Sequence, residues 1–598
     1  MSFDGAFALP FSIGCAVMMA VIGYKFIRWI YILPDSDKRL ICRNILSRRS
    51  WQAVGECVTE GLLHRRIFRV NPLLGYMHAS LATGWFLLIV AGAVEVIVYL
   101  GWTPIPLRGH VFFRYYAREI PHTEPWQVAA ADVMDTLLAV VLSGVLLAWC
   151  KRAYSRMMGM RRTTRHIVGD RVALTALWCV FPARLLAESI TAALWHNGGF
   201  LTEAVGGILA SVVPLGTLLR LEGLAWLFYA LSLGVFFCAM PFSRYMHIFT
   251  EIPLIFLRRW GVRSDERPKS FDHFQIEACS RCGLCIDVCQ LGRDAQIDNV
   301  QSVYFLRDRR YGILTAEIAD NCLMCGRCSE RCPVELDINN LRQNSRYSLH
   351  NSPSFRRYDY LRGVDSSMGG GNIGYFAGCM TLLSPRILMA MEQLFEAAKQ
   401  KVWWADRTGG VCCGRPLKLA GEVDASREMM RHNTNLFVKH GIDTLVTSCP
   451  ICLKVFREDY NLQGIEVLHH SEYILRLIEQ GQLRVEPTDR IFAYHDPCEL
   501  GRGCGIYDQP RRVIESIGVL VEPAETRAYA LCCGSSIANT AISDQAQLTI
   551  ASQLGRVLEA TGADEIITAC PLCKKAVRRG TKLPVRDLAE AVANHLYK

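Results

Sequence analysis

Charged residues are scarce in the first part of this 598-residue chain, and their scarcity there excludes an ordinary soluble domain. Only 20% of all residues are charged whereas 51% are hydrophobic, and the apolar excess lies before residue 260. No basic segment precedes the first apolar stretch, so we expect no cleavable signal peptide. The net charge of +10 arises largely in short loops between apolar segments. That distribution is typical of membrane topology, and we expect no nucleic-acid partner.

Five apolar segments are each close to or above the roughly 20 residues that cross a bilayer. They are Ala6–Leu33, Gly75–Leu100, Val133–Cys150, Val172–Trp195 and Leu224–Phe249. Basic residues gather between the first and second segments and between the third and fourth, so the positive-inside rule predicts an N-terminus outside. Everything after the fifth segment is then cytoplasmic. The sequence predicts a multi-pass protein of the inner (cytoplasmic) membrane.

Two histidines lie at matching depth in these segments. His78 is near the start of the second segment and His247 near the end of the fifth, and both ends are cytoplasmic in the predicted topology. Imidazoles from two helices at one depth can hold a haem iron from both sides. The alternative is that each is an interfacial histidine with a local hydrogen bond. Five others are expected to be solvated: His64, His110, His122, His166 and His196.

Charged residues within the apolar segments are costly and therefore informative. Arg184 and Glu188 stand four residues apart, so they can pair on one helix face. We expect a structural ion pair there, with a quinone or proton site as the alternative. Arg28 and Glu95 are close enough to segment ends to reach the membrane surface.

Eight cysteines form two runs with the spacing C-x2-C-x2-C-x3-C, which binds cubane [4Fe–4S] clusters. In this pattern three thiolates of one run and the last cysteine of the other hold each cluster. The predicted sets are Cys279, Cys282, Cys285 and Cys332 for one cluster, and Cys322, Cys325, Cys328 and Cys289 for the other. Zinc, the alternative, prefers two separated pairs of ligands. Pro333 follows the second run as expected, but Gln290 stands at the same place after the first.

Ten further cysteines form a duplicated pattern of a lone Cys, then Cys-Cys-Gly, then Cys-Pro-x-Cys. The two copies are Cys379, Cys412, Cys413, Cys449 and Cys452, and Cys498, Cys532, Cys533, Cys570 and Cys573. Short β-rich runs end just before cysteines, at Asn372–Phe376, Leu445–Thr447, Ile491–Tyr494 and Glu565–Thr568. Helical segments alternate with them, so we expect a duplicated α/β fold with thiolates at the carboxyl ends of strands. Adjacent cysteine side chains diverge, and therefore suit different irons of one cluster.

The apolar part resembles the five-helix gamma subunit of respiratory nitrate reductases and the cytochrome b subunit of membrane heterodisulfide reductase. The stretch Pro241-Phe-Ser-Arg-Tyr-Met-His247 is similar to the end of that family's fifth helix. The nitrate reductase subunit has a second histidine pair deeper in the same helices, where this chain has Leu88 and Tyr229. The resemblance implies a five-helix transmembrane bundle with one haem b near the cytoplasmic face.

The duplicated pattern resembles the cysteine-rich CCG-domain subunit of heterodisulfide reductase. The resemblance implies one or two non-cubane [4Fe–4S] clusters at which a disulfide is cleaved; structural zinc is the alternative. His495, three residues before Cys498, can donate a proton to a product thiolate or hydrogen-bond to the cluster. The order of cytochrome, ferredoxin and CCG parts is also similar to flavoprotein:menaquinone iron–sulfur oxidoreductases.

These patterns together predict four domains: a cytochrome b-like domain at 1–260, an α-helical two-cluster ferredoxin domain at 261–350, and CCG domains at 351–480 and 481–598. The predicted function is a membrane-bound oxidoreductase that couples menaquinone or another quinone to a cytoplasmic disulfide/thiol pair. Two alternatives stay open. Electron-transfer flavoprotein can be the cytoplasmic partner, or the chain can be an electron-transfer subunit of a larger complex.

Overall fold

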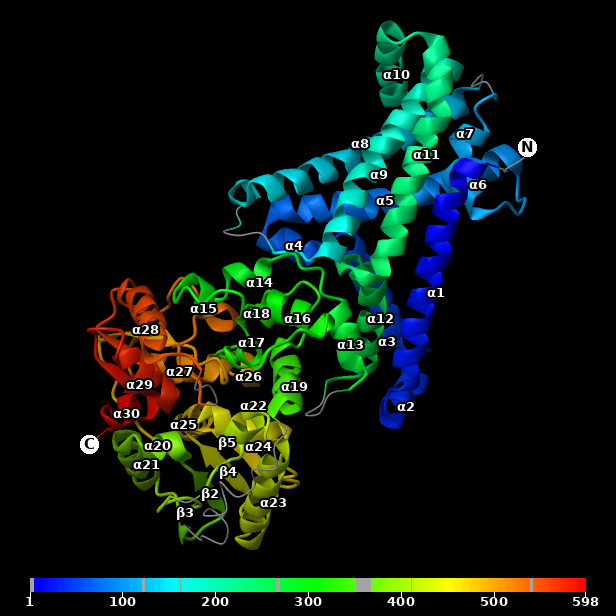
Figure 1. Cartoon of the computed structure of the whole chain (residues 1–598). Helices are drawn as coiled ribbons and strands as arrows, with labels where there is room; N and C mark the ends of the chain where they lie inside the picture. The colour runs from blue at the N-terminus through cyan, green and yellow to red at the C-terminus, as the bar shows by residue number, and fades with distance from the viewer. Residues whose placement is uncertain are drawn as a thin grey trace. The chain divides into compact units, whose positions relative to one another are not determined.

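The computed structural model describes residues 5–120, 124–158, 160, 164–264, 269–350, 367–409, 411–537 and 541–597 (Figure 1). Its chain contacts divide it into two compact units. The first, here called the membrane unit, comprises Met1–Arg263 and Lys269–Gly283. The second, here called the cluster unit, comprises Ser264–Pro268 and Leu284–Lys598.

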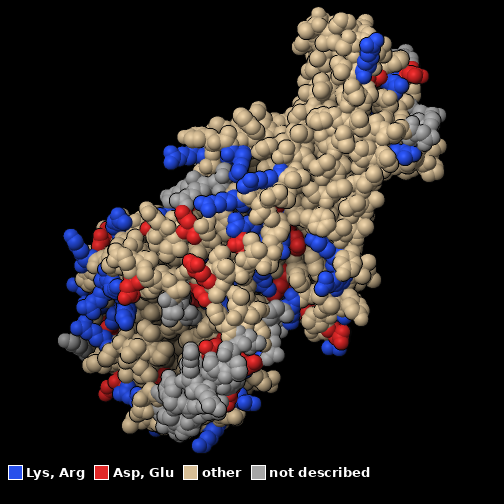
Figure 2. Space-filling view, viewed as in Figure 1, with Lys and Arg blue, Asp and Glu red and all other residues tan. Residues whose placement is uncertain are grey.

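Among the described residues of the membrane unit, five helices are long enough and apolar enough to cross a bilayer. They are α1 (Leu9–Tyr31), α5 (Pro72–Leu100), α8 (Pro125–Ala153), α9 (Val168–Trp195) and α11 (Leu215–Ala239). Helix α11 packs between α1 and α9, and α5 packs on α8 (Figure 1). Few charged side chains interrupt the visible surface of these helices (Figure 2). Each of the five expected segments therefore falls largely in a helix that is long enough and apolar enough to span a membrane.

Shorter elements connect and flank the five long helices. Before α5 these are η1 (Ala6–Ala8), α2 (Asp35–Asn44), α3 (Arg48–Glu56), the π-helix η2 (Cys57–Leu62) and α4 (Arg65–Val70). Between the later spans lie α6 (Leu107–Val111), α7 (Phe113–Tyr116), η3 (Ser155–Met158) and α10 (Phe200–Val212). After α11 come η4 (Met240–Phe242), η5 (Arg244–Met246), α12 (His247–Trp260) and α13 (Phe271–Glu277).

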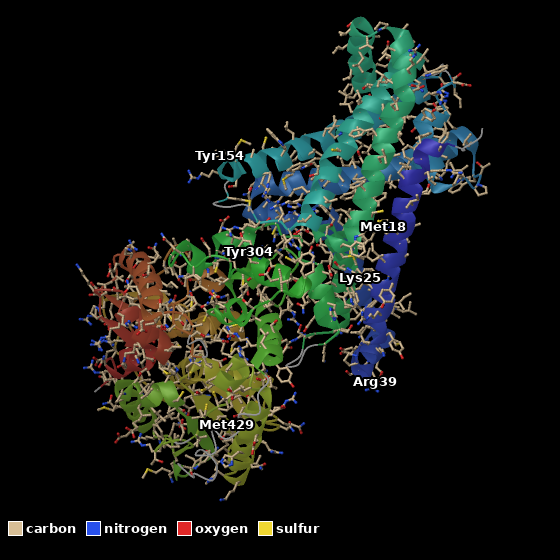
Figure 3. All side chains as sticks on the ribbon, viewed as in Figure 1. Met18, Lys25, Arg39, Tyr154, Tyr304 and Met429 are labelled. Atoms are coloured by element: carbon tan, nitrogen blue, oxygen red, sulfur yellow. The ribbon has the colours of Figure 1, made fainter. Side chains whose placement is uncertain are left out.

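The fifth span ends earlier than its hydropathy suggested. The apolar helix covers Leu215–Phe242 rather than Leu224–Phe249, and His247 begins the separate helix α12. Pro241 lacks the N–H that would continue the α11 hydrogen-bond ladder, so the chain turns through two short 3-10 helices. Lys25 of α1 donates to the Pro241 carbonyl at 2.7 Å and holds this break (Figure 3). His247 therefore stands at the end of the bundle, on a short helix of its own.

The cluster unit begins with the short helices of the ferredoxin part. They are α14 (Leu284–Asp287), α15 (Gln290–Arg293), α16 (Ser302–Arg310), α17 (Ala316–Asp320), α18 (Arg327–Glu330) and α19 (Ile338–His350). Arg342 and Arg346 of α19 are buried and donate to backbone carbonyls of Ile318, Ala319 and Asp320 around the second cysteine run. These guanidinium groups satisfy carbonyls at the C-terminal end of the short helix α17, which have no partner within the helix.

Two sheets follow, one in each copy of the duplicated cysteine pattern. The first has the order β1-β3-β2-β4-β5, from β1 (Met368–Gly369), β2 (Ile373–Phe376), β3 (Val402–Trp404), β4 (Thr444–Thr447) and β5 (Glu466–His469). The second has the order β7-β6-β8-β9, from β6 (Ile491–His495), β7 (Val519–Val521), β8 (Glu565–Thr568) and β9 (Val585–Asp587). All pairs are parallel except β1 with β3.

Helices alternate with these strands along the chain. The first copy contains α20 (Cys379–Leu382), α21 (Pro385–Ala397), α22 (Arg415–Ala420), α23 (Val423–Lys439), α24 (Pro450–Glu458) and α25 (His470–Glu479). The second contains α26 (Gly501–Cys504), α27 (Asp508–Glu515), η7 (Arg527–Tyr529), α28 (Asp544–Glu559), α29 (Pro571–Arg578) and α30 (Leu588–Ala593). One buried apolar cluster, including Tyr375, Leu394, Ile474, Tyr494 and Ile514, spans both copies and joins them.

Strand register places the cysteines at one edge of each sheet. In the first sheet Phe376 is paired with Thr447, and the chain continues from them to Cys379 and Cys449. In the second sheet His495 is paired with Thr568, followed by Cys498 and Cys570. Because neighbouring parallel strands end together, the lone cysteine and the Cys-Pro-x-Cys group of each copy start from the same edge.

Candidate redox centres

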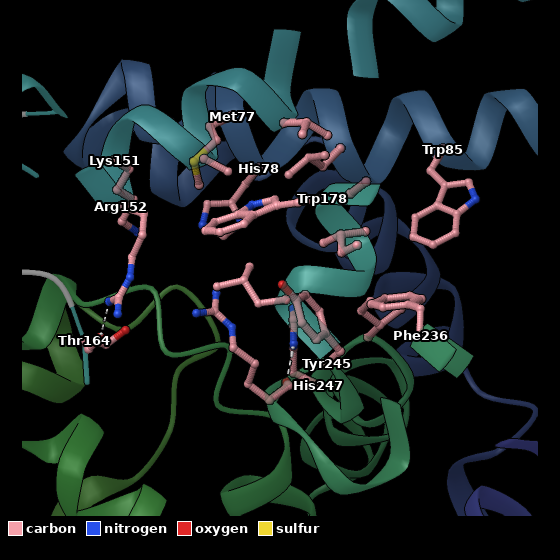
Figure 4. Close-up of a pocket in the computed structure, with 18 of the residues that line it drawn as sticks. Met77, His78, Trp85, Lys151, Arg152, Thr164, Trp178, Phe236, Tyr245 and His247 are labelled. Atoms are coloured by element: carbon pink, nitrogen blue, oxygen red, sulfur yellow. Dashed lines mark hydrogen bonds between the residues drawn. The ribbon is translucent and has the colours of Figure 1, made fainter. Parts of the chain in front are cut away.

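A large pocket lies in the membrane unit between α5, α8, α9 and α12 (Figure 4). Its volume is about 1040 Å³, open to the outside, and its lining includes both predicted haem ligands, His78 and His247. Aromatic side chains of Trp85, Trp178 and Phe236 form much of the apolar wall. A mostly apolar pocket with a few polar groups is the usual form of a cofactor site.

Both histidines line this pocket, and their hydrogen bonding can be compared with that of iron ligands. The Nδ1 of His247 donates to the Arg244 carbonyl at 2.7 Å, which directs Nε2 away from its own backbone. A backbone carbonyl on Nδ1 commonly fixes the tautomer of a metal-binding histidine. The Nε2 of His78 is buried and has no hydrogen-bond partner among the residues that the structure describes. A buried imidazole nitrogen without a partner is costly unless something else binds it, so these residues fit a haem.

Two histidines expected to be solvated also line this pocket. His64 stacks on His78 with ring centroids 5.5 Å apart, and His166 is half-buried. Burial lowers the pKa of His64, and it lowers the pKa of His166 to about 3, so both rings are neutral at pH 7. The expectation was wrong because basic flanking residues do not reveal that a loop folds back over a pocket. His196 is exposed as expected, His110 is half-buried, and His122 lies outside the described residues.

Within the membrane unit, the first cysteine run is attached directly to this pocket. Arg281, between Cys279 and Cys282, forms a fully buried ion pair with Asp170 at the start of α9. The other oxygen of Asp170 accepts from the Arg244 backbone N–H at 2.8 Å. Lys151, which lines the pocket, donates to the Cys282 carbonyl at 3.0 Å. Two sets of contacts therefore connect the first cysteine loop with the residues around His247.

The predicted ligands of one cubane converge within the cluster unit. The Cys328 thiol is in electrostatic contact with Cys322, Cys325 and Cys289, and burial raises its pKa to about 12. Burial also raises the pKa of Cys289 to about 11. For the other predicted set, Cys279 and Cys282 belong to the membrane unit, and Cys285 and Cys332 to the cluster unit.

The five cysteines of the first duplicated pattern also come together. Cys413 accepts hydrogen bonds from Cys412 and Cys452, which lower the pKa of its thiol well below the usual value. Cys379 interacts with Cys449 and Cys413. Asp406 accepts from the backbone N–H groups of Ala377 and Gly378 at 2.8 and 2.7 Å, and so holds the loop that carries Cys379. Burial raises the pKa of Asp406 to about 6.

The second pattern repeats this arrangement and adds His495. Hydrogen bonds from Cys532 and Cys573 lower the pKa of the Cys533 thiol well below its usual value, and the nearby His495 lowers it further. His495 is 2% exposed, and the corresponding position in the first sheet is Phe376. A cavity of about 430 Å³ opens beside Cys498, Cys533, Cys570 and Cys573. The second centre therefore has a cavity beside its cysteines and a polar residue, His495, where the first centre has Phe376.

The cysteine groups of the cluster unit are in contact with one another. Cys532 hydrogen-bonds to Cys325 of the ferredoxin part, which lowers the pKa of Cys325 to about 5. Cys570 of the second pattern is in electrostatic contact with Cys449 of the first. The spatial order is thus ferredoxin cysteines, second pattern, first pattern. In the described part of the chain, no three His, Cys, Asp or Glu side chains converge around a single metal ion.

Gln290, the departure from the ferredoxin spacing, lies at the first of these contacts. Its side-chain amide donates to the Cys532 carbonyl at 3.2 Å and accepts from the Cys532 N–H at 2.7 Å. Both residues are buried, at 2% and 1% exposure. Arg502 adds a bond of 2.6 Å to the Cys325 carbonyl. A proline at position 290 could make neither of these hydrogen bonds, which is a physical reason for the glutamine at this position.

Comparisons with known proteins agree with these two cysteine patterns. A cysteine-rich domain family matches residues 373–457 and 492–578, and a 4Fe-4S dicluster domain family matches residues 275–336. One chain of the dihydromethanophenazine:CoB–CoM heterodisulfide reductase from Methanosarcina mazei is 26% identical over 54% of this chain and 94% of its own length. One chain of the fumarate reductase (CoM/CoB) from Methanothermobacter marburgensis is 26% identical over 52% of this chain and 70% of its own length.

A third relative also covers the membrane unit. EtfAB:quinone oxidoreductase from Syntrophomonas wolfei subsp. wolfei is 21% identical over 86% of this chain and 86% of its own length. A probable membrane-anchored ferredoxin from Chromohalobacter salexigens is 25% identical over 55% of this chain. With five apolar helices, a dicluster domain and two cysteine-rich domains, the chain is a membrane-associated iron–sulfur oxidoreductase related to the cysteine-rich chain of heterodisulfide reductase.

Proposed function

We propose that the chain moves electrons between the quinone pool and a cytoplasmic two-electron carrier. In this proposal the membrane unit holds one haem b between His78 and His247, the ferredoxin part holds two cubane clusters, and the CCG domains hold non-cubane clusters. When bound, these groups supply the one-electron carriers, and a quinone such as menaquinone is the membrane substrate. The N-terminus lies outside, and the cysteine-rich part is cytoplasmic.

The observation that supports this proposal best is the sequence of contacts between cysteine groups. Cys325 is in contact with Cys532, and Cys570 lies near Cys449. In space, the second CCG domain therefore lies between the cysteines of the ferredoxin part and those of the first CCG domain. Metal sites with a purely structural role do not need to lie close to one another in this way. This order is suited to successive one-electron transfers over short distances.

The chain's own residues have defined roles in this scheme. His78 and His247 hold the haem iron, with His247 oriented by the Arg244 carbonyl. Gln290 and Arg502 keep the ferredoxin cysteines against the second CCG domain. His495 stabilises negative charge on Cys533 and can deliver a proton to a product thiolate. We place the domain boundaries at 1–260, 261–350, 351–480 and 481–598.

Two cytoplasmic partners are compatible with these residues. The relative that matches the membrane unit as well as the cysteine-rich part is named EtfAB:quinone oxidoreductase, which favours electron-transfer flavoprotein. Two complete five-cysteine patterns and the relatives named heterodisulfide reductase favour a disulfide/thiol pair. We propose the flavoprotein as the first candidate and the disulfide as the second.

An absorbance assay separates the two partners. The purified full-length protein in detergent is mixed with each partner while the Soret band of the haem is followed. Reduction of the haem by reduced flavoprotein, with no response to a disulfide, supports the first candidate. Reoxidation of reduced haem by a disulfide alone supports the second. A haem that responds to neither, in a protein with full cluster content, contradicts both and favours an electron-transfer component of a larger complex.

A further inference from the structure

Five charged side chains are buried together in the membrane unit, away from the haem pocket. They come from the connecting helix α7 and from three spans: Glu95 of α5, Arg114 of α7, Asp135 of α8, and Arg184 and Glu188 of α9. The residues Glu95, Arg114, Asp135 and Glu188 are at most 7% exposed. We call this set the buried charge cluster. Sequence placed only Arg184 and Glu188 together, because Arg114 lies outside the apolar segments.

Each carboxylate of the cluster is held in a different way. Glu188 accepts from the Arg184 Nε at 3.0 Å. One oxygen of Asp135 accepts three hydrogen bonds from α10, from the Leu201 and Thr202 backbone N–H groups and from the Thr202 hydroxyl, at 2.8 to 2.9 Å. These three donors hold one oxygen of Asp135, whereas its other oxygen, Oδ1, is buried without a hydrogen-bond partner among the described residues.

Glu95 is held least firmly. Its Oε1 is 3.8 Å from the nearest guanidinium nitrogen, that of Arg114, which is beyond hydrogen-bond distance. The Nε and Nη2 atoms of Arg114 are buried and have no hydrogen-bond partner, although they face this cluster. A buried guanidinium with unmade hydrogen bonds beside a loosely held carboxyl indicates that the pair can adopt a second arrangement.

The charge count of the cluster leaves one carboxylate without a balancing cation when no proton is bound. Three carboxylates face two guanidinium groups, so the fully ionised cluster carries one negative charge. An unpaired charge inside a bilayer is costly, and one proton on a carboxyl removes it. Tyr229 of α11 and Tyr99 of α5 also face the cluster but are not ionised at neutral pH. Glu95 has the fewest hydrogen bonds of the three carboxyls, so it is the group that gains a proton when further negative charge enters the bundle.

The same helices connect the cluster with the haem pocket. Trp85 lines the pocket, and Glu95 follows it ten residues later on α5, about 15 Å along the helix. Leu177 of α9 lines the pocket, and Arg184 follows it seven residues later. An electron that enters the pocket adds negative charge to a low-dielectric bundle, and the cluster is close enough to sense that charge.

We propose that Glu95 is a proton-binding site of the membrane unit that takes up a proton when this unit is reduced and releases it on reoxidation. The proton neutralises the negative charge of the added electron, so charge balances at each step. Arg114 is the positioning residue that adjusts to the two states of Glu95. The proton exchanges at the end of the bundle that carries α6, α7 and α10. This inference rests on the proposed haem as the site of reduction.

Infrared spectroscopy tests the proposal on the full-length protein in detergent. The difference spectrum between dithionite-reduced and oxidised protein should contain a carbonyl band of a protonated carboxylic acid that shifts in D₂O. The band should be lost in Glu95→Gln and displaced, not lost, in Glu95→Asp. Glu119→Gln removes an exposed carboxyl five residues after Arg114 and should leave the band unchanged. The haem midpoint potential should fall with rising pH in the wild type and should fall less steeply in Glu95→Gln.

The outcomes separate this inference from the function on which it rests. Suppose that haem absorption is normal. If the carboxyl band is then absent, or is unchanged in both Glu95 variants, only the proton site is overturned. A protein without haem absorption overturns the proposed function, and the proton site with it. Should Glu95→Gln fail to bind haem, Glu95→Asp and Arg114→Lys decide the question, because each keeps the charge type. If the band shifts in neither Glu95→Asp nor Arg114→Lys, the assignment is contradicted.

Discussion

Gln290→Ala should separate the ferredoxin part from the second CCG domain in function without removing any predicted cluster ligand. The side chain makes two hydrogen bonds to the backbone of Cys532, and both partners are buried. Removing it leaves a buried N–H and a buried carbonyl without partners. Each such group costs about 1–3 kcal/mol, so the local contact weakens by roughly 2–6 kcal/mol. Even the lower limit corresponds to about a 30-fold change in an equilibrium constant.

Gln290→Pro sharpens this experiment because it restores the spacing expected of a ferredoxin run. Position 290 is the first residue of α15, where proline is well tolerated. The proline variant therefore preserves the backbone while it removes the amide, and we expect it to behave like Gln290→Ala. Gln296→Ala is the matched control, since Gln296 is exposed in the same part of the chain.

The assay is rapid-freeze electron paramagnetic resonance of the reduced protein, which follows electrons as they leave the cubane signals. Both Gln290 variants should retain their iron and sulfide content but transfer electrons to the CCG centres at least about tenfold more slowly. The control, Gln296→Ala, should transfer electrons at the wild-type rate. Wild-type rates in Gln290→Ala and Gln290→Pro would refute the reasoning. Loss of cubane iron in both would show that Gln290 supports cluster assembly instead.

Three further predictions concern single contacts. Asp170→Asn leaves Arg281 buried without its partner, which should destabilise the first cysteine loop by about 3–5 kcal/mol and lower the temperature at which the first cubane bleaches; an unchanged bleaching temperature would contradict this. His247→Ala should abolish the b-type haem spectrum, and a retained Soret band would remove the ligand assignment. His495→Phe, which copies the first domain's Phe376, should keep the cluster but shift its potential downward by tens of millivolts in a redox titration, because a polar neighbour that stabilises negative charge on Cys533 is lost; an equal potential would exclude that influence.

Spacing rules predicted the cysteine chemistry well because each rule reflects a fixed local geometry. Cys322, Cys325 and Cys328 lie in one short loop, and the pattern itself requires a fourth ligand from the other run; the structure brings Cys289 to that place. The expected strands appear as β2, β4, β6 and β8 with ends that differ by one residue at most. The sequence could not predict which CCG domain contacts the ferredoxin part, because Cys325 and Cys532 are far apart in sequence and no local spacing connects them.

The membrane unit was less predictable for a different reason. Hydropathy found the five spans but extended the fifth past its end, because apolar residues such as Phe242, Met246 and Ile248 continue beyond the point where the helix stops. His64 and His166 reach the haem pocket from loops, where no periodicity indicates direction. Arg114 was missed because it stands between spans, although it contributes to the buried charge cluster.

The most direct test of the account is the iron and acid-labile sulfide content of the purified full-length protein. The account predicts more iron than two cubanes and one haem require, with matching sulfide and no stoichiometric zinc. Replacing Cys412 and Cys413 together with serine should remove part of that excess, and replacing Cys532 and Cys533 the rest. Iron that only accounts for the two cubanes and the haem, or zinc in the CCG domains, would contradict the central claim.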